Sequence, residues 1–369
     1  MIYQRKFKQP YLLILISVIG TFITSCKKDD SEKPYVPEQE TYFNLTQGVT
    51  IANEGAYGSG NASFSIFYPT GDSVSNNVYF NVNGVSLGDV LQSIGFAGDN
   101  AYMVLNASNK IEVIDKDSCY QITTITDLSS PRYFLSLSNQ KAYISLWGNG
   151  GKVGVLNLLT NTLTKEITVG IGPEKMAMVS GKVFVANSGG WSTDNKISVI
   201  NTTTDEVSAT ITVGDNPKDI VVDKNGKIWV LCAGNVVYDG NYNIVSQTES
   251  QLVRISPTTN EIEATISLGE AYHPSLLEIN ATGDVLYYGG DWSTSGVFSI
   301  SITASAKATT PLINDYFYGF NVDPTDGVIY GLQSPSFTSP GTLKTFSPSG
   351  ELLGSYSVGI GPNGAYFAD

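Results

Sequence analysis

The chain has 369 residues, with 34 Asp and Glu against 21 Lys and Arg, and only 15% of its residues are charged. An acidic surface of this kind repels phosphate backbones, which excludes nucleic-acid binding through the usual basic footprint. The chain has a single histidine, His273, so a metal site built from several histidines is excluded as well.

Residues 1–25 have the pattern of an export signal. Three basic residues at positions 5, 6 and 8 precede an apolar stretch over 11–23, which is shorter than the roughly 20 residues of a comfortable membrane span. The stretch ends in Ile-Thr-Ser-Cys, and this resembles the bacterial lipobox, in which Cys26 is lipidated and becomes the new N-terminus. An ordinary signal peptide with a chance cysteine is the alternative. Without the three basic residues of the signal, 18 Lys and Arg remain, so the net charge of the mature chain is −16.

Residues 26–45 are predicted to form a lipid anchor and a tether. The run Lys-Lys-Asp-Asp at 27–30 follows the cysteine directly and resembles the surface-export tag of Bacteroidetes lipoproteins. Two prolines, Pro34 and Pro37, then suit an extended linker. Together these features predict a protein held in the outer membrane by its lipid and facing the cell exterior.

A repeat runs through residues 46–369. Similar segments end at Pro131, Pro173 ("ITVGIGP"), Pro217 ("ITVGDNP") and Pro274, at spacings of 42, 44 and 57 residues. Within 174–217 there are four short runs of alternating apolar residues separated by turn residues, which indicates antiparallel strands. A four-stranded propeller blade takes about 40–45 residues, so the third spacing indicates a blade with an insertion.

The units predict blades at about 94–131, 132–173, 174–217, 218–274, 275–316 and 317–359. Residues 46–93 supply three further strands, expected at 49–52, 63–68 and 77–82, but lack a first strand. The C-terminal "GIGPNGAYFAD" offers the missing one. The prediction is an all-β, seven-bladed β-propeller closed by pairing N- and C-terminal strands in one blade, because closure removes exposed sheet edges. Six or eight blades remain alternatives, and no window outside the signal predicts an amphipathic helix.

The pattern "VFVAN…ISVINTTTDEVSATITVG.NP" resembles the YVTN/YncE-type propellers over essentially all of residues 46–369. The segment "IANEGAYGSGNASFSIF" at 51–67 is similar to the opening of Bacteroidetes surface lipoprotein propellers grouped as DUF5074-like. Among these, the resemblance points to the cobalamin-capturing, BtuG-like lipoproteins that cap a TonB-dependent transporter. It implies a seven-bladed propeller, cobalamin or a related corrinoid as ligand, and a transporter barrel as partner.

The register of the repeat sorts the aromatic residues. Trp229 falls within a second strand and is expected in the core, and Cys119 and Cys232 fall in different blades as small core or strand residues. Loops between second and third strands carry Tyr57, Trp147, Trp191, Tyr238, Tyr242, Trp292 and Phe337. Loops between blades carry Arg132, Tyr133, Lys218, Tyr272, His273, Tyr316 and Tyr318. All these loops converge on one face of a propeller, so the residues are predicted to form a ligand platform. Local packing over the blade edges is the alternative for any single one.

The leading hypothesis is therefore a non-enzymatic surface protein that captures a nutrient, a corrinoid or a glycan, and hands it to a TonB-dependent receptor. No catalytic residue and no cofactor is predicted, although carboxylates could bind Ca²⁺ or assist hydrolysis. These carboxylates are Glu54, Glu174, Asp219, Asp239 and Asp291. An envelope scaffold for protein interactions and a metal-dependent hydrolase or lactonase remain alternatives. No two carboxylates recur at a spacing that defines a mechanism.

Overall fold

The computed structural model describes residues 43–291 and 294–368. The predicted signal, the predicted lipidation site Cys26, most of the predicted tether and the predicted site residue Trp292 lie outside these described residues. No helix in the described ranges is long and apolar enough to cross a membrane.

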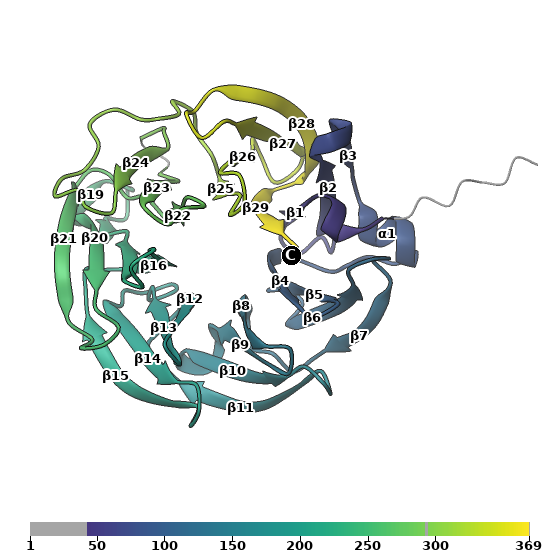
Figure 1. The fold of residues 1–369 in the computed structure, drawn as a ribbon, viewed down its shortest axis with the longest axis horizontal. Helices are drawn as coiled ribbons and strands as arrows, with labels where there is room; N and C mark the ends of the chain where they lie inside the picture. The colour runs from purple at the N-terminus through teal and green to yellow at the C-terminus, as the bar shows by residue number, and fades with distance from the viewer. Residues whose placement is uncertain (1–42, 292–293, 369) are drawn as a thin grey trace, which may run out of the picture. The chain divides into compact units, whose positions relative to one another are not determined.

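Seven of the eight β-sheets in the described chain are arranged as a ring of blades around a central axis (Figure 1). Blade 1, from the innermost strand outward, consists of β4 (Leu91–Ala97), β5 (Asn100–Leu105), β6 (Lys110–Asp115) and β7 (Gln121–Ile125). Blade 2 consists, in the same order, of β8 (Pro131–Ser138), β9 (Lys141–Leu146), β10 (Lys152–Asn157) and β11 (Thr162–Thr168). Blade 3 consists of β12 (Pro173–Val179), β13 (Lys182–Asn187), β14 (Lys196–Asn201) and β15 (Glu206–Thr212). Blade 4 consists of β16 (Pro217–Val222), β17 (Ile228–Cys232), β20 (Ser250–Ile255) and β21 (Ile262–Gly269). Blade 5 consists of β22 (Leu276–Ile279), β23 (Val285–Gly289) and β24 (Phe298–Ser301). Blade 6 consists of β25 (Gly319–Val322), β26 (Ile329–Gln333), β27 (Pro340–Phe346) and β28 (Leu352–Ile360).

The seventh blade, which we call the closing blade, joins the two ends of the chain as predicted. Its order is β29 (Pro362–Phe367), β1 (Val49–Asn53), β2 (Ser63–Tyr68) and β3 (Ser73–Ser75). The C-terminal β29 is innermost and pairs antiparallel with β1, with Ile51 opposite Ala365. The ring is therefore closed by backbone hydrogen bonds instead of a covalent link.

The core lies between the blades, because both faces of each sheet meet a neighbouring sheet. In β13, Val183 and Val185 belong to the cluster shared with blade 2, whereas Phe184 and Ala186 belong to the cluster shared with blade 4. This is the two-residue alternation of a strand, applied to a sheet buried on both sides. Seven such clusters fill the seven junctions between blades.

The expected core residues lie where the sequence places them. Trp229 is fully buried in β17, and its indole Nε1–H donates to Asp223 Oδ2 at 3.0 Å. Cys119 and Cys232 are both buried and free. Cys119, however, lies in the turn between β6 and β7 and not on a strand.

The strand expected at 77–82 is wrong, because this segment contains the helix α1 (Val78–Asn83). Asn77 takes a left-handed conformation with φ of 56°, which turns the chain into the helix. The consecutive residues Val78 and Tyr79 are both buried in one core cluster, whereas a strand would direct them to opposite faces. The third strand of this part of the blade is the short β3 instead. Three short 3₁₀ helices complete the fold: η1 (Leu45–Gln47), η2 (Pro69–Gly71) and η3 (Gly148–Gly150).

Blades 4 and 5 depart from the repeat. The insertion expected in blade 4 is a separate hairpin, β18 (Val236–Tyr238) and β19 (Ile244–Gln247), between the second and third strands. Blade 5 has three strands among the described residues, with a single bridge between Val297 and Ile313 beside them.

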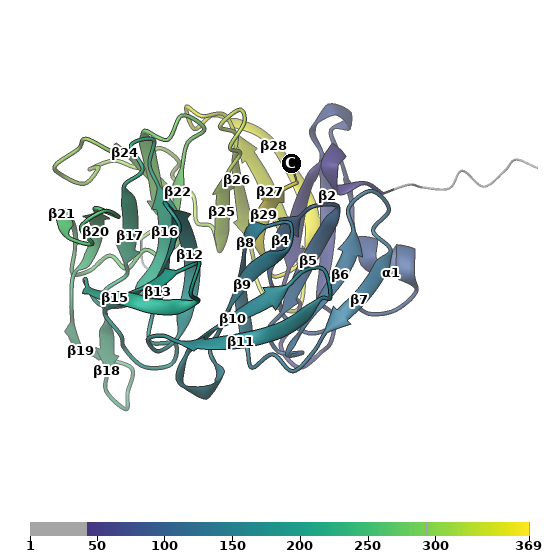
Figure 2. The ribbon, with the colours of Figure 1, turned by 60° about the horizontal axis from the view of Figure 1, so that its bottom comes forward.

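Successive strands alternate in direction, so all loops from second to third strands and all entries into the next blade lie on one face. We call it the loop face. The hairpin projects there, and the described chain enters β1 from the opposite face (Figure 2).

Candidate functional site

A cavity of about 1010 Å³ opens on the loop face, where the innermost strands begin. All seven blades contribute to its lining. Representatives are Glu54 and Asn363 of the closing blade, then Gln92, Arg132, Glu174, Lys218, Leu276 and Tyr318 of blades 1 to 6.

The repeat itself places four polar side chains in this cavity. Four inner strands, β8, β12, β16 and β29, begin with a proline, which suits a first strand position because proline has no N–H to donate. The residue after each proline lines the cavity: Arg132, Glu174, Lys218 and Asn363. In each of these four blades the proline serves the fold, and the residue after it lines the cavity with a charge that differs from blade to blade.

Aromatic side chains surround the opening. Trp191 is 97% exposed and Tyr57 is 85% exposed, so neither is needed for the core. Trp147 and Trp191 meet edge to face, with ring centroids 5.7 Å apart. Phe337 meets Tyr318 in the same way at 5.5 Å. Flat apolar rings of this kind suit a planar or partly apolar ligand.

Beneath the tryptophans, Arg132 forms the centre of a polar chain across three blades. Its Nε donates to Glu174 Oε2 at 3.1 Å and its Nη2 to Glu174 Oε1 at 3.2 Å, while Nη1 donates to Gln92 Oε1. Burial on its own lowers the pKa of Arg132, but the carboxylate of Glu174 outweighs this and the pKa is raised. The guanidinium therefore stays charged and fixed in position.

On the other side of the cavity, Glu54 is held by two neutral donors. Asn363 Nδ2 donates to Oε1 at 2.8 Å, and the Tyr318 hydroxyl donates to Oε2 at 3.1 Å. Burial raises the pKa of Glu54 in spite of both hydrogen bonds and the nearby Arg132. The carboxyl group of Glu54 is thus more easily protonated than that of an ordinary glutamate.

A second layer of charges lies further along the inner strands. The Lys175 ammonium pairs with Asp219 at 2.8 Å and with Glu278 at 3.3 Å, and Asn321 Nδ2 donates to Glu278 Oε1 at 2.8 Å. Burial raises the pKa of Glu278 to about 7. All the charged groups of this layer have partners within the protein.

The structure brings eight of the fourteen predicted site residues together in one cavity. They are Tyr57, Arg132, Tyr133, Trp147, Trp191, Lys218, Tyr318 and Phe337. Trp292 lies outside the described residues.

The other five predicted residues do not line the cavity. Tyr238 and Tyr242 are exposed on the hairpin β18–β19. Tyr272 packs against Phe298 with ring centroids 5.5 Å apart, which is the local packing that the sequence left open. His273 places its Nδ1 2.7 Å from the carbonyl of Ala233.

Tyr316 also lies beyond the cavity lining, in the connection between β24 and β25. Its backbone carbonyl accepts from Gln333 Nε2 at 3.1 Å.

Sequence reasoning missed several residues of the site. Glu54 and Glu174 were expected only as candidate calcium or hydrolytic carboxylates, and Gln92 and Asn363 were not singled out. Asn363 could have been predicted, because it directly follows the proline that begins an inner strand. Gln92 follows Leu91, so no comparable signal marks it.

Among residues 43–291 and 294–368, no group of three or more His, Cys, Asp or Glu side chains is arranged to hold a metal ion. The metal-dependent hydrolase alternative therefore has no candidate centre in that part of the chain.

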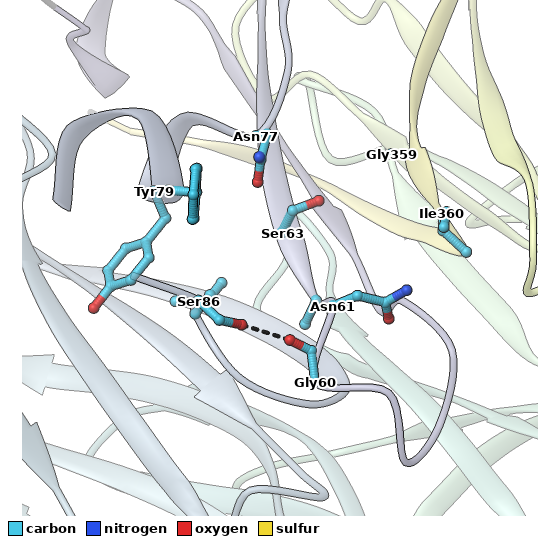
Figure 3. A pocket seen from close by; sticks show the side chains of 11 residues that line it. Gly60, Asn61, Ser63, Asn77, Tyr79, Ser86, Gly359 and Ile360 are labelled. Carbon is cyan, nitrogen blue, oxygen red and sulfur yellow. Dashed lines mark hydrogen bonds between the residues drawn. The ribbon is translucent and has the colours of Figure 1, made fainter. Parts of the chain in front are cut away.

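A second, smaller cavity of about 360 Å³ lies beside α1 (Figure 3). Its lining includes Asn61, Ser63, Tyr79 and Ile360, and the Ser86 hydroxyl donates to the carbonyl of Gly60. No charged side chain lines it, and none of the predicted site residues does.

A protein-family model described as a domain of unknown function, DUF5074, matches residues 47–351. A comparison with curated proteins finds no match. The solved structures that resemble the chain include a quinonprotein alcohol dehydrogenase-like protein from Bacteroides thetaiotaomicron, at a TM-score of 0.64 and 13% identity over 88% of this chain and 79% of the other. They also include a periplasmic gluconolactonase from Pseudomonas aeruginosa, at a TM-score of 0.62 and 14% identity over 87% of this chain and 99% of the other. A putative 6-phosphogluconolactonase from Bacteroides fragilis matches at a TM-score of 0.62 and 12% identity, over 88% of this chain and 98% of the other. At these identities the similarity establishes the fold alone.

Proposed function

We propose that this chain, which belongs to the family described as domain of unknown function DUF5074, is a binding protein that captures a nutrient in the cavity of its loop face. The carrying observation is the cavity itself, which has about 1010 Å³ and is lined from all seven blades beneath exposed aromatic rings. This volume is in the upper range of small-molecule sites, so the ligand is a large one.

The rigidity of the surroundings supports tight binding. The polar lining belongs mainly to inner strands whose sheets are buried on both sides, and Arg132, Glu174 and Glu54 are already held by hydrogen bonds. A site that is formed before the ligand arrives orders little on binding and loses little free energy in doing so.

The charge of the cavity supports a ligand that is not strongly charged overall. Its lining has two acids, Glu54 and Glu174, and two bases, Arg132 and Lys218. The chain as a whole carries a formal net charge of −13. The cavity is thus a balanced region on an otherwise acidic protein.

Cobalamin or a related corrinoid is the specific ligand we propose, on the resemblance of residues 51–67 to cobalamin-capturing lipoproteins. A corrinoid combines a large, nearly planar ring with many amide groups, which matches an aromatic rim over hydrogen-bonding groups. With this ligand we also propose a lipid anchor at Cys26, a location on the outer membrane facing the cell exterior, and transfer to a TonB-dependent receptor.

Retention of cyanocobalamin tests this proposal. The protein is incubated with cyanocobalamin, washed on a desalting column and read for the corrinoid absorbance, and the affinity is measured by calorimetry. We expect retention by the wild type and about fivefold to 150-fold weaker binding by Trp191→Ala, since an aromatic contact is worth about 1–3 kcal/mol. Tyr242→Ala is the matched control, because Tyr242 is 88% exposed on the same face but lies outside the cavity. No retention by the wild type, or equal affinity of Trp191→Ala, would contradict the proposal.

A role in protein contact is a second candidate, favoured by the hairpin β18–β19. It exposes Val237, Tyr238, Tyr242, Ile244 and Val245, each by 42% or more. An apolar projection of this kind is typical of an interaction surface. Replacement of residues 236–247 by a short Gly-Ser turn tests it: co-purification with a TonB-dependent receptor should be lost while ligand affinity is unchanged.

A further inference from the structure

The polar groups around the cavity form two hydrogen-bonded chains, and one ammonium group beside them has no hydrogen-bond partner among the described residues. The first chain runs from Gln92 through Arg132 to Glu174, across blades 1 to 3. The second joins Asn363 to Glu54 and Tyr318, across the closing blade and blade 6. Lys218 of blade 4 lies between the ends of these two chains.

The Lys218 ammonium makes no hydrogen bond with any described residue. Its nearest carboxylate oxygen is Glu174 Oε1, at 4.0 Å, which is beyond hydrogen-bonding distance. Glu174 already accepts from both Nε and Nη2 of Arg132, so its charge is shared with a closer cation. The Lys218 side chain is only 30% exposed and lines the cavity.

Among the described residues that line the cavity, the neighbouring blade 5 contributes no charged side chain beside Lys218. In the lining, blade 5 contributes Ser275 and Leu276, and the Ser275 hydroxyl donates to the carbonyl of Gly290 at 3.0 Å. Lys175, one residue along the equivalent strand from Glu174, shows the contrast, since its ammonium has two carboxylate partners within 3.3 Å. A partly buried ammonium without such a partner favours a ligand that supplies one.

We propose that Lys218 is a specificity-determining residue that selects ligands with an oxyanion, a carboxylate or a phosphate-type group, beside a planar ring. The ring rests against the aromatic rim formed by Trp147 and Trp191, and the oxyanion accepts a charge-assisted hydrogen bond from the Lys218 ammonium. The inference rests on the proposed function in one respect, namely that this cavity is the ligand site. It adds the chemical class of the group that the ligand presents toward blade 4.

Two fluorescent dyes with the same ring system test the charge requirement without any corrinoid. 1-Anilinonaphthalene-8-sulfonate carries an oxyanion, and N-phenyl-1-naphthylamine is its neutral counterpart. We expect the wild type to bind the sulfonate more tightly than the neutral dye, and Lys218→Met to lose about tenfold to a hundredfold in sulfonate affinity. Neutral-dye affinity should stay the same, and Lys218→Arg should restore the preference.

Lys165→Met is the matched control, because it removes the same charge from an exposed position on the outer strand β11. It should keep the wild-type preference, and circular dichroism should show that both variants are folded. Equal ratios of the two affinities in the wild type and Lys218→Met would overturn the inference.

Cyanocobalamin and dicyanocobinamide, which lacks the phosphodiester, separate this inference from the proposed function. If the wild type binds cyanocobalamin and Lys218→Met binds it equally well, the role of Lys218 is wrong and the proposed function stands. If the wild type binds neither corrinoid but Lys218→Met loses its dye preference, the corrinoid proposal is wrong and the oxyanion site stands. Both are supported if Lys218→Met weakens cyanocobalamin about tenfold and leaves dicyanocobinamide unchanged.

Discussion

Arg132 lies directly against Trp147, with its guanidinium carbon 4.2 Å from the ring centroid of the indole. The edge of the same guanidinium is engaged by the Glu174 carboxylate. One side chain thus connects the aromatic rim to the polar lining beneath it. The position of Trp147 is consequently determined by a charged residue of the adjacent inner strand as well as by its own loop.

Replacement of Arg132 by lysine should disturb this connection although the charge is kept. Lysine has neither the planar fork that matches a carboxylate nor the flat face that stacks on an indole. We expect Arg132→Lys to lower the free energy of unfolding by about 1–3 kcal/mol and to weaken ligand binding. Urea denaturation measures the first effect, and Lys165→Arg serves as a control that should stay within about 0.5 kcal/mol of the wild type. An unchanged denaturation midpoint in Arg132→Lys would contradict this account.

Replacement of Trp229, in strand β17, should affect stability, whereas replacement of Trp191, beside the cavity opening, should affect ligand binding. Trp229 is fully buried and bonded to Asp223, so Trp229→Ala should cost about 3–5 kcal/mol of stability. Trp191 is 97% exposed, and Trp191→Ala should change stability by no more than about 0.5 kcal/mol while weakening ligand binding. Paired denaturation and binding measurements separate the two roles. A large stability loss in Trp191→Ala would show that the rim is structural.

Stability should depend on pH through Glu278. Its pKa in the folded protein is raised from 4.5 to about 7, so the folded state binds a proton more tightly than the unfolded state does. The stabilising contribution is therefore complete below pH 4.5 and is lost as the pH rises through about 7. Glu278→Gln removes this dependence, so its stability relative to the wild type should rise between pH 5 and pH 8, by up to about 3 kcal/mol. A constant difference across this range in urea titrations would show that Glu278 does not titrate there.

Closure by hydrogen bonds predicts that the ring tolerates a new start point. The inner strand β29 ends at the face where the described chain enters β1, so a short linker from Ala368 to Phe43 should join them. A permuted chain that begins at Pro362 and ends at Gly361 should fold with a similar melting temperature. A permutant cut inside β13 is the control and should lose stability, because that strand is buried in two core clusters. Loss of the fold in the first permutant would show that the order of the chain ends matters for closure.

The sequence alone determined the blades, because the repeat is local. Each strand of the YVTN-like pattern alternates apolar residues over a few positions, and turn residues separate the strands, so the propeller and its closure by "GIGPNGAYFAD" could be predicted without contacts. The same register separated the core residue Trp229 from Trp147 and Trp191 on the rim. The register did not predict α1. Val78 and Tyr79 differ from strand residues because both are buried in the same core cluster, and this burial depends on neighbours that are distant in the sequence.

The membership of the site was decided only by the tertiary structure. Tyr57, Trp191 and Tyr242 are equivalent by their loops, yet only the first two line the cavity, because the insertion in blade 4 carries Tyr242 away on its own hairpin. The pairing of Arg132 with Glu174, 42 residues apart, and of Tyr318 with Glu54, 264 residues apart, depends on side chains that meet between neighbouring blades. A local pattern specifies which residues reach the loop face. Only the closed ring determines which of them meet, and which cation is left for a ligand.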